Sequence, residues 1–276
     1  MLEYNIDVNS KDLDIRKTFD CGQCFRWKIL GNNQCIGVVD GKFVWIIRID
    51  NNTISVKTDG MDKTKLIEYL GLNDDYNKID SLDLNDFEMR AKRSGQGIRI
   101  LHQDPWEASV SFIISQRNNI PKIKSTIEKL CSRLGNRVEL DLGNTKTCYY
   151  VFPTAEQIVT GGIGVLNECG LGYRSEYVLQ LAKEYVGNKN LFNKYFDKSI
   201  SSEYVVSDLM KHRGIGPKVA NCIALFGLNR LDMFPIDVWI QRVIDEYYDG
   251  HIDISRFGEF AGVIQQYIFY YVKYVG

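Results

Sequence analysis

Short runs of β-branched and aromatic residues fill the first third of the chain. Four such runs, at 24–30, 34–39, 42–49 and 53–57, are separated by turn residues such as Gly31-Asn32-Asn33 and Asp40-Gly41. Runs of this length with turn residues between them are typical of paired strands. The first third of the chain therefore predicts an antiparallel meander.

Beyond residue 96 the apolar residues recur every three or four positions. The spacing is clearest over 121–134, 175–186 and 258–275, and it gives each stretch one apolar face as a helix. Asp104 before Pro105 is typical of a helix start, as is the pair Thr154 and Gln157. We therefore expect an α+β protein, with an antiparallel β-sheet domain over 1–96 followed by a mostly α-helical domain over 97–276.

The charge on the chain is nearly balanced. Its 276 residues carry 34 Lys and Arg against 35 Asp and Glu, which gives a net charge of −1. No global positive field therefore indicates a nucleic-acid partner, and any such contact must come from local basic clusters. Two clusters are candidates, at 90–99 and 211–218, although such clusters are equally typical of a solvated face.

The cysteines and the apolar stretches indicate a cytoplasmic protein. Seven cysteines form an odd set, and the N-terminus lacks a signal-like apolar core, so we expect reduced thiols in a cytosol. Cys21 and Cys24 have metal-ligand spacing, but no second pair completes a zinc or iron–sulfur site, so we expect no metal cluster. The longest apolar stretch, 222–228, is too short to span a membrane.

The most informative segment is L-M-K-H-R-G-I-G-P-K-V-A at 209–220. We expect a helix that ends near His212, a tight turn at Gly214 and Gly216, and a second helix from Pro217, in a hairpin over about 203–228. Two glycines around an aliphatic residue let backbone N–H groups approach a phosphate, and the helix N-terminus adds a favourable dipole. The alternative is an ordinary αα-hairpin with a glycine turn.

Lys218 and Asp237 are the candidate catalytic residues. Lys218 lies on the first turn of the second helix, where the helix dipole and the loss of water both favour a neutral amine. A neutral lysine is a nucleophile that forms a Schiff base with a sugar carbon, whereas a charged lysine would only contact phosphate. Asp237 begins a further helix as its N-cap, and its carboxylate could also stabilise an oxocarbenium-like sugar.

These motifs resemble a known family. The G-I-G-P-K-V-A hairpin at 214–220 and the P-I-D at 235–237 are similar to the helix-hairpin-helix (HhH-GPD) glycosylase superfamily, and the hairpin lysine resembles its bifunctional members. Three further segments resemble the 8-oxoguanine DNA glycosylase branch, namely C-G-Q-C-F-R-W at 21–27, S-F-I-I-S-Q-R-N-N-I at 111–120 and G-L-G-Y-R at 170–174. The resemblance covers nearly the whole chain and indicates a bacterial or archaeal member.

The resemblance implies a base excision repair enzyme. Such an enzyme would flip 8-oxoguanine out of duplex DNA, remove it through a Schiff base on Lys218 with Asp237 as partner, and cleave the strand by β-elimination as an AP lyase. The implied partner is double-stranded DNA with an oxidised purine, and we expect a monomer that needs no cofactor. Whether a structural monovalent cation binds the hairpin carbonyls stays open.

The resemblance also implies how the damaged base is read. The backbone carbonyl of Gly22 would accept the N7 hydrogen that 8-oxoguanine has and guanine lacks. Cys222 and Phe269 would pack on the two faces of the base, and Gln265 would read its edge. Without the resemblance, Gln265 and Phe269 are typical of a surface amide and a buried aromatic residue.

A second implied group contacts the DNA around the lesion. Asn118, Tyr173 and Arg174 match positions that wedge the duplex and read the cytosine left behind. Two residues depart from the family: Arg117 stands where asparagine is usual, and Lys122 where the animal enzymes often have arginine. Because lysine cannot make a bidentate guanidinium contact, we expect a weaker preference for cytosine opposite the lesion.

Two other functions remain open. A monofunctional alkylpurine glycosylase of the same superfamily would share the hairpin and Asp237 but lack the hairpin lysine, so Lys218 argues against it. A non-catalytic DNA-binding module would use the hairpin as an anchor, but it leaves Asp237 and the 21–27 segment without a role.

Overall fold

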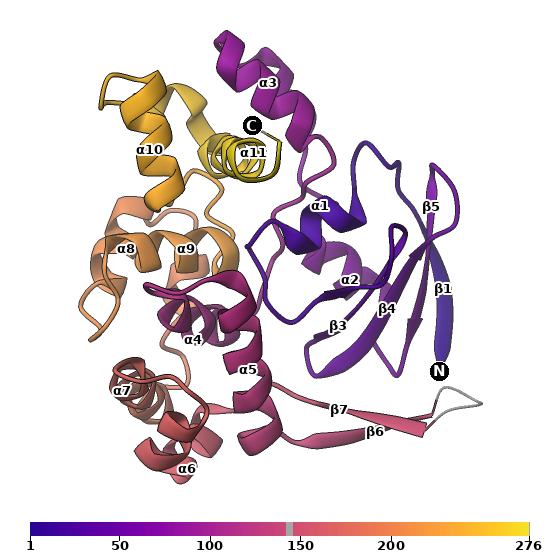
Figure 1. Ribbon diagram of the computed structural model, residues 1–276, viewed down its shortest axis with the longest axis vertical. Coiled ribbons are helices and arrows are strands. Elements are labelled where there is room, and N and C mark those ends of the chain that lie inside the picture. Colours follow the sequence, from indigo (N-terminus) through magenta and orange to yellow (C-terminus); the bar gives the residue numbers. More distant parts are fainter. Residues whose placement is uncertain (142–145, 276) are drawn as a thin grey trace.

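The computed structural model describes residues 1–141 and 146–275. Figure 1 shows a twisted sheet with helices α1 (Ile15–Asp20) and α2 (Lys63–Tyr69) on one side of the molecule and most of the other helices on the opposite side. The strands of the sheet are antiparallel and follow the order β1-β5-β4-β3-β2. Their bounds are β1 Leu2–Asp7, β2 Lys28–Ile29, β3 Gln34–Val39, β4 Lys42–Arg48 and β5 Thr53–Thr58.

The predicted meander is confirmed for β3, β4 and β5, whereas the run at 24–30 is wrong as a strand and β1 was not predicted. Only β2 forms within that run, because residues 21–27 are a loop that crosses the core. Trp27 stacks on Phe19 with ring centroids 4.0 Å apart. The amide Nε2 of Gln23 donates to the carbonyl of Arg99 at 2.7 Å. The aromatic residues of this segment therefore serve packing and not strand pairing.

The rest of the described chain is mostly helical, so the expected α+β fold class is confirmed. Its helical elements are η1 Tyr76–Ser81, α3 Asp86–Gly95, α4 Pro105–Ser115, α5 Ile120–Leu134, α6 Ala155–Glu168, α7 Arg174–Gly187, η2 Asn193–Phe196, α8 Ser202–Leu209, α9 Pro217–Gly227, α10 Val238–Tyr247, η3 Ile254–Phe260 and α11 Ala261–Tyr274. The apolar faces of these helices form a core distinct from that of the sheet. Among the described helices, none is long and apolar enough to cross a membrane.

Local helix starts agree with the sequence, but two features of the helical part differ. The Asp104 and Thr154 side chains cap α4 and α6 as predicted. A hairpin of β6 (Arg137–Asp141) and β7 (Lys146–Tyr150), which was not predicted, lies between α5 and α6 and extends towards the sheet (Figure 1). The last helix begins at Ala261 and not at 258, because Gly258 has a φ of +53° that breaks the helix.

Helix α3 lies within the segment 1–96 yet packs on α11. A Cβ at Gly95 would lie 2.7 Å from Cγ of Tyr267, so only glycine permits this approach of the two helices. Phe87 and Ala91 of α3 join the core of the helical part. The domain boundary near residue 96 stays a prediction.

Helix α11 is buried along most of its length, with every side chain from Ala261 to Phe269 inaccessible or nearly so. Two hydrogen bonds fix it to distant segments. The amide Nε2 of Gln266 donates to the carbonyl of Cys21 at 2.8 Å, and the backbone N–H of Gly262 donates to the carbonyl of Leu231 at 2.7 Å. The helix therefore has a defined rotation and height relative to both the 21–27 loop and the loop that follows α9.

The close packing at Gly262 generates a stability prediction. In the variant Gly262→Ala the new Cβ would lie 2.7 Å from the carbonyl oxygen of Met233, a backbone atom that cannot move freely. We expect a loss of about 1–3 kcal/mol in the free energy of unfolding, the usual cost of overpacking a core. The control is Gly187→Ala at the end of α7, where a Cβ meets nothing within 4 Å. Urea unfolding that finds both variants equally stable would contradict the packing assigned to α11.

Candidate active site

The turn between α8 and α9 is built on two glycines. Gly214 has a φ of +86°, and a Cβ there would lie 2.5 Å from Cβ of Tyr177, so both conformation and space require glycine. Gly216 is the N-cap residue of α9 and has no side chain to cap it, so the first N–H groups of the helix stay available as donors. Pro217 begins α9 as predicted, whereas α8 ends at Leu209 and not near His212. The turn is shaped to present backbone donors to an anion.

Lys218 lies half-buried on the first turn of α9, where this helix meets the end of α4. Its amine Nζ donates to Oγ of Ser115 at 3.3 Å and lies 5.3 Å from the ring centroid of Phe112. Both neighbours come from α4, so this helix determines where the amine points. Ser115 was not singled out from the sequence, although it stands within the 111–120 motif.

Cys222 and Asp237 lie beside this lysine. Cys222 is one turn after Lys218 and 3% exposed. Burial raises the pKa of the Cys222 thiol, the Lys218 amine partly opposes this shift, and the charge of Asp237 adds to it. The thiol is therefore protonated at neutral pH, and it lies within the fields of both charged groups. The Asp237 carboxylate caps α10 by accepting from the N–H groups of Trp239 at 3.0 Å and Ile240 at 2.9 Å.

The residues expected to read a base come from two distant segments. Gly22, in the loop after α1, has a φ of +85°, and a Cβ there would lie 3.3 Å from Cδ1 of Ile120 and 3.6 Å from Cε1 of Phe269. Gln265 is one turn before Phe269 and 4% exposed, and its side-chain oxygen Oε1 has no hydrogen-bond partner in the described chain. The structure thus brings Gly22 to the Phe269 ring. It also leaves Oε1 of Gln265 as a buried acceptor on α11, the helix that carries Phe269.

Lys273 is a residue of this site that the sequence reading missed. It lies one turn after Phe269, half-buried, with Nζ 4.9 Å from the centroid of the Phe269 ring. Burial lowers its pKa, while the charges of Asp237 and Asp20 oppose the shift. The i, i+4 spacing from Phe269, at the end of an otherwise apolar helix, is the feature that could have identified it.

A second cluster forms where the loop before α5 meets the start of α7. Arg174 donates from Nε to the carbonyl of Gln116 at 2.9 Å and from Nη1 to that of Leu171 at 3.2 Å, and it lies over the ring of Tyr173. Tyr173 itself is 52% exposed. Arg117, exposed, has a φ of +46°, which is uncommon for a side chain of this size.

Asn118 and Lys122 belong to the same cluster. Asn118 donates from Nδ2 to the carbonyl of Ile114 at 3.3 Å, which holds it at the end of α4. Lys122 is exposed, and its Nζ would lie 3.8 Å from a Cβ at Gly170, so it extends towards the G-L-G-Y-R segment. The structure therefore gathers Arg117, Asn118, Lys122, Tyr173 and Arg174 on one side of the candidate site.

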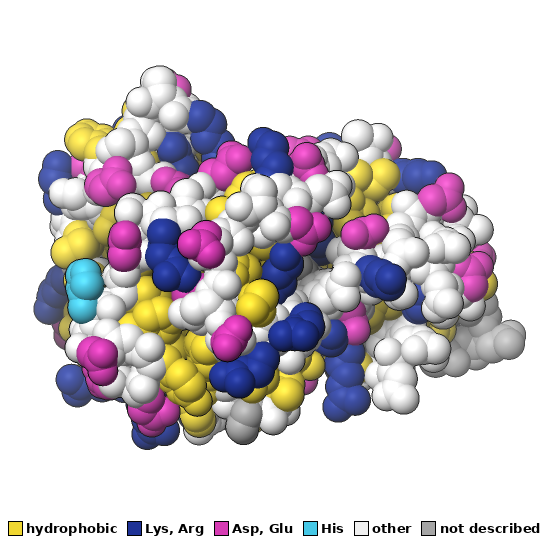
Figure 2. All heavy atoms as spheres, turned by 90° about the horizontal axis from the view of Figure 1, so that it is seen from above, with side chains coloured by type: hydrophobic (Ala, Val, Ile, Leu, Met, Phe, Trp, Pro, Cys, Tyr) yellow, Lys and Arg dark blue, Asp and Glu magenta, His cyan; other side chains and the backbone are white. Residues whose placement is uncertain are grey.

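Gln116 links this cluster to the α8–α9 turn. Its side-chain Nε2 donates to the carbonyl of Gly214 at 2.9 Å, and its own carbonyl accepts from the guanidinium of Arg174. One residue therefore fixes the spacing between the α8–α9 turn and the Arg174 loop. Acidic and basic side chains are interspersed over the face of the molecule seen in Figure 2, in keeping with local clusters on a chain of balanced charge.

Two family models match the chain. The model of the 8-oxoguanine DNA glycosylase N-terminal domain matches residues 5–108, and the model of the HhH-GPD superfamily base excision DNA repair proteins matches residues 110–253. The N-glycosylase/DNA lyase of Saccharomyces cerevisiae is 32% identical over 265 residues, which cover 87% of this chain and 70% of that relative.

Two solved structures are similar along almost their whole length. MBOgg1 in complex with a low-affinity DNA ligand is 33% identical with a TM-score of 0.88, and the alignment covers 98% of this chain and 95% of that one. The 8-oxoguanine glycosylase/lyase of Clostridium acetobutylicum, in complex with double-stranded DNA containing cytosine opposite 8-oxoguanine, is 31% identical with a TM-score of 0.82. That alignment covers 94% of this chain and 91% of the Clostridium chain.

The cap at α10 separates the structural role of Asp237 from any chemical one. In Asp237→Ala both hydrogen bonds to Trp239 and Ile240 are lost, so we expect a loss of about 1 kcal/mol in the free energy of unfolding. Asp237→Asn keeps the cap and should be close to the wild type in urea unfolding. An asparagine variant as unstable as the alanine variant would show that the charge, and not the cap, stabilises α10.

Proposed function

Because the chain belongs to the 8-oxoguanine DNA glycosylase family of helix-hairpin-helix base excision repair proteins, we propose that it removes 8-oxoguanine from duplex DNA and then cleaves the strand. It is a bifunctional N-glycosylase/DNA lyase. One observation about its own residues carries the proposal. The Lys218 amine and the Asp237 carboxylate both lie close enough to the buried Cys222 to shift the pKa of its thiol. This cluster lies beside α11, the helix that bears Phe269 and Gln265.

The flipped base is bound between α9 and α11. Its two faces pack against Cys222 and Phe269, and the protonated thiol of Cys222 adds no charge there. The unpartnered Oε1 of Gln265 accepts from the edge of the base, which offsets the cost of burying an unsatisfied oxygen. The carbonyl of Gly22 accepts the N7 hydrogen of 8-oxoguanine, and a guanine in the same place would set its N7 lone pair against that oxygen.

Lys218 supplies the nucleophile. The lone pair of its amine nitrogen forms a bond to C1′, the electrons of the glycosidic bond leave with the base, and the base takes up a proton. The nitrogen then loses one of its two protons, and the C1′–O4′ bond breaks as O4′ takes up a proton. The product is an iminium ion that keeps the other N–H proton. Removal of a proton from C2′ then expels the 3′ phosphate, which completes the lyase step. Asp237 stabilises the positive charge that develops on the sugar.

The DNA backbone is anchored by the α8–α9 turn. The free N–H groups at the start of α9, beside Gly214 and Gly216, bind a phosphate without regard to sequence. Tyr173 and Asn118 fill the space that the flipped nucleotide leaves, and Arg117, Lys122 and Arg174 face the orphan base.

We place this reaction in the cytoplasm and expect a monomer, because one chain supplies the nucleophile, the base pocket and the anchor. The reaction needs no cofactor. A structural monovalent cation bound to the carbonyl groups of the hairpin is compatible with this proposal.

Replacement of the nucleophile gives the sharpest kinetic test. Lys218→Gln should lose base release and lyase activity by at least about a thousandfold, because no other group supplies the attacking amine. Its affinity for duplex DNA with 8-oxoguanine should stay close to that of the wild type, because anchoring comes from backbone N–H groups. The matched control is Lys183→Gln on the exposed face of α7, which should be fully active. Single-turnover excision measures the rate, and normal base release by Lys218→Gln would reduce this lysine to a phosphate contact.

The opposite base generates a second prediction. The donors of Arg174 already bond to backbone carbonyls, whereas Lys122 and Arg117 form no ion pair with any residue that the structure describes. Lysine makes no bidentate contact with cytosine, so we expect detectable excision opposite thymine, guanine and adenine. Lys122→Arg should sharpen the preference for cytosine by roughly 5- to 150-fold, the range of one bidentate contact.

Four duplexes that differ only in the base opposite 8-oxoguanine provide this measurement. Single-turnover rates on the four should spread further apart for Lys122→Arg than for the wild type. Equal selectivity of the two proteins would show that Lys122 does not determine the preference for cytosine. Arg117 would then be the residue that contacts the orphan base.

A further inference from the structure

A cavity of about 530 Å³ lies on the far side of α11 from the candidate active site. It is open to solvent on one side and lined by residues of η1, α3 and α11, by the loop at Lys11 and by the segment 96–99. Tyr267 lines it, and Tyr267 is two residues from both Gln265 and Phe269. Two residues correspond to about 200° around a helix, so the cavity and the base-reading pair lie on opposite faces of α11. The volume is within the usual range for small-molecule sites, about 300–1,000 Å³.

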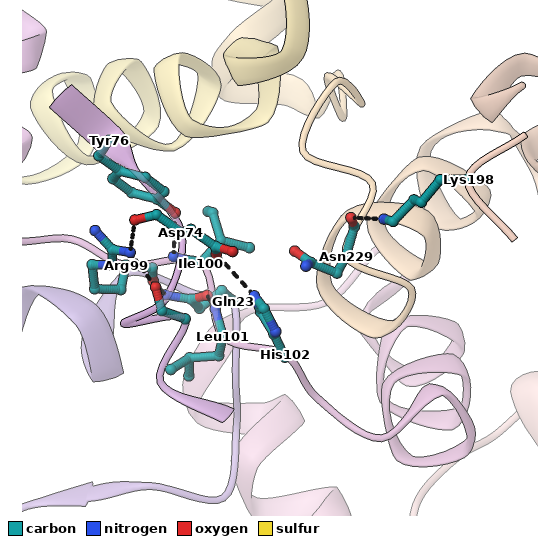
Figure 3. Close-up of polar contacts among 10 residues, drawn as sticks. Gln23, Asp74, Tyr76, Arg99, Ile100, Leu101, His102, Lys198 and Asn229 are labelled. Atoms are coloured by element: carbon teal, nitrogen blue, oxygen red, sulfur yellow. Dashed lines mark hydrogen bonds and ion pairs between the residues drawn. The ribbon is translucent and has the colours of Figure 1, made fainter. Parts of the chain in front are cut away.

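The walls of the cavity offer flat and apolar surfaces. Tyr76 and Tyr267 provide rings, and Ile98 provides an aliphatic wall between them. The guanidinium of Arg99 lies 3.7 Å from the centroid of the Tyr76 ring, and its Nη2 donates to the carbonyl of Asp74 at 2.7 Å. Figure 3 shows Arg99 beside Tyr76, in the segment that continues to Ile100 and Leu101. Such walls suit a planar ring.

Two polar groups at the cavity lack hydrogen-bond partners within the described chain. Tyr267 is 6% exposed, and its hydroxyl forms no hydrogen bond with the residues that the structure describes. Burial raises the pKa of this hydroxyl, so it keeps its proton and can donate. Arg99 is 5% exposed, and its Nε has no acceptor. A buried donor without an acceptor, such as Arg99 Nε, is rare in proteins. The Tyr267 hydroxyl, at the wall of the cavity, can donate to an acceptor on a ligand.

The charge at the cavity favours an anion. The cavity is lined by four cationic side chains and by only two carboxylates, those of Asp12 and Asp80. The Asp80 carboxylate is already paired with Lys92 at 2.5 Å. Lys11 and Arg93 are exposed at the rim, and neither forms an ion pair within the described chain. A ligand with a ring in the cavity and an anionic group at the rim would meet both of these cations.

We propose that this cavity binds a small aromatic anion, in the chemical class of a purine mononucleotide. The ring lies between Tyr76 and Tyr267, an acceptor on the ring takes the proton of the Tyr267 hydroxyl, and the phosphate is bound by Arg93 and Lys11. Because α11 carries Tyr267 on one face and Phe269 on the other, the ligand also steadies the helix that reads the base. Binding itself does not depend on the glycosylase reaction.

Isothermal titration calorimetry with guanosine monophosphate tests the proposal. Guanosine and inorganic phosphate, the two halves of this probe, should each bind at least about tenfold more weakly, because each lacks one set of contacts. Tyr267→Phe should weaken binding by about tenfold through the loss of one hydrogen bond. Arg93→Gln should do the same through the loss of a charge-assisted contact. Met89→Trp, at an exposed position of the rim, should block entry.

Two controls separate this cavity from the base pocket. Tyr271→Phe, one turn further along α11 and not at the cavity, should bind the probe normally. Phe269→Ala, which alters the base pocket, should also bind normally even if it loses excision. The proposal is overturned if no saturable binding occurs, if guanosine binds as well as the nucleotide, or if Phe269→Ala loses binding while Tyr267→Phe keeps it. The last result would place the nucleotide in the base pocket.

Discussion

The burial of α11 is the constraint on which the rest of the structure depends. The helix is enclosed from Ala261 to Phe269, and hydrogen bonds from Gln266 to the 21–27 loop and from Gly262 to Leu231 fix its rotation. Burying this much apolar surface favours one arrangement strongly, since each large side chain contributes about 1.5–3 kcal/mol. That arrangement sets Phe269 against Gly22 and turns Tyr267 towards the opposite face. One packed helix therefore defines both the base pocket and the cavity behind it.

The second constraint is the α8–α9 turn, which decides where the amine and the DNA meet. Glycine is required at Gly214 because the Tyr177 ring leaves no room for a Cβ, and Gln116 ties that turn to the Arg174 loop. The same turn sets Lys218 on the first turn of α9, with its amine next to Ser115. The proposed anchor for the DNA backbone and the proposed nucleophile thus lie within one short segment, 214–218, and a fixed spacing positions a reacting group better than a mobile loop would.

Local features were predictable from the sequence, and long-range ones were not. The caps at Asp104 and Thr154 follow from hydrogen bonds within a few residues, so the sequence alone determines them. The pairing of β1 with β5 spans about fifty residues, and nothing in the short segment 2–7 indicates its partner. The meeting of Gly22 with Phe269 came from the family resemblance, because no periodicity relates the two. Lys273 was missed because its position four residues after Phe269 gains meaning only when the Phe269 ring is known to line the site.

In the proposed reaction the Lys218 amine, and no other, becomes bonded to C1′ of the sugar. Lys273 is a demanding internal comparison, because it is half-buried, its pKa is lowered by burial, and it lies over the same Phe269 ring. The direct measurement is borohydride reduction of the enzyme on duplex DNA with 8-oxoguanine, followed by proteolysis and mass spectrometry of the modified peptide. The account predicts a deoxyribose adduct on Lys218 alone. An adduct on Lys273, or on any other lysine while Lys218 stays unmodified, would contradict it.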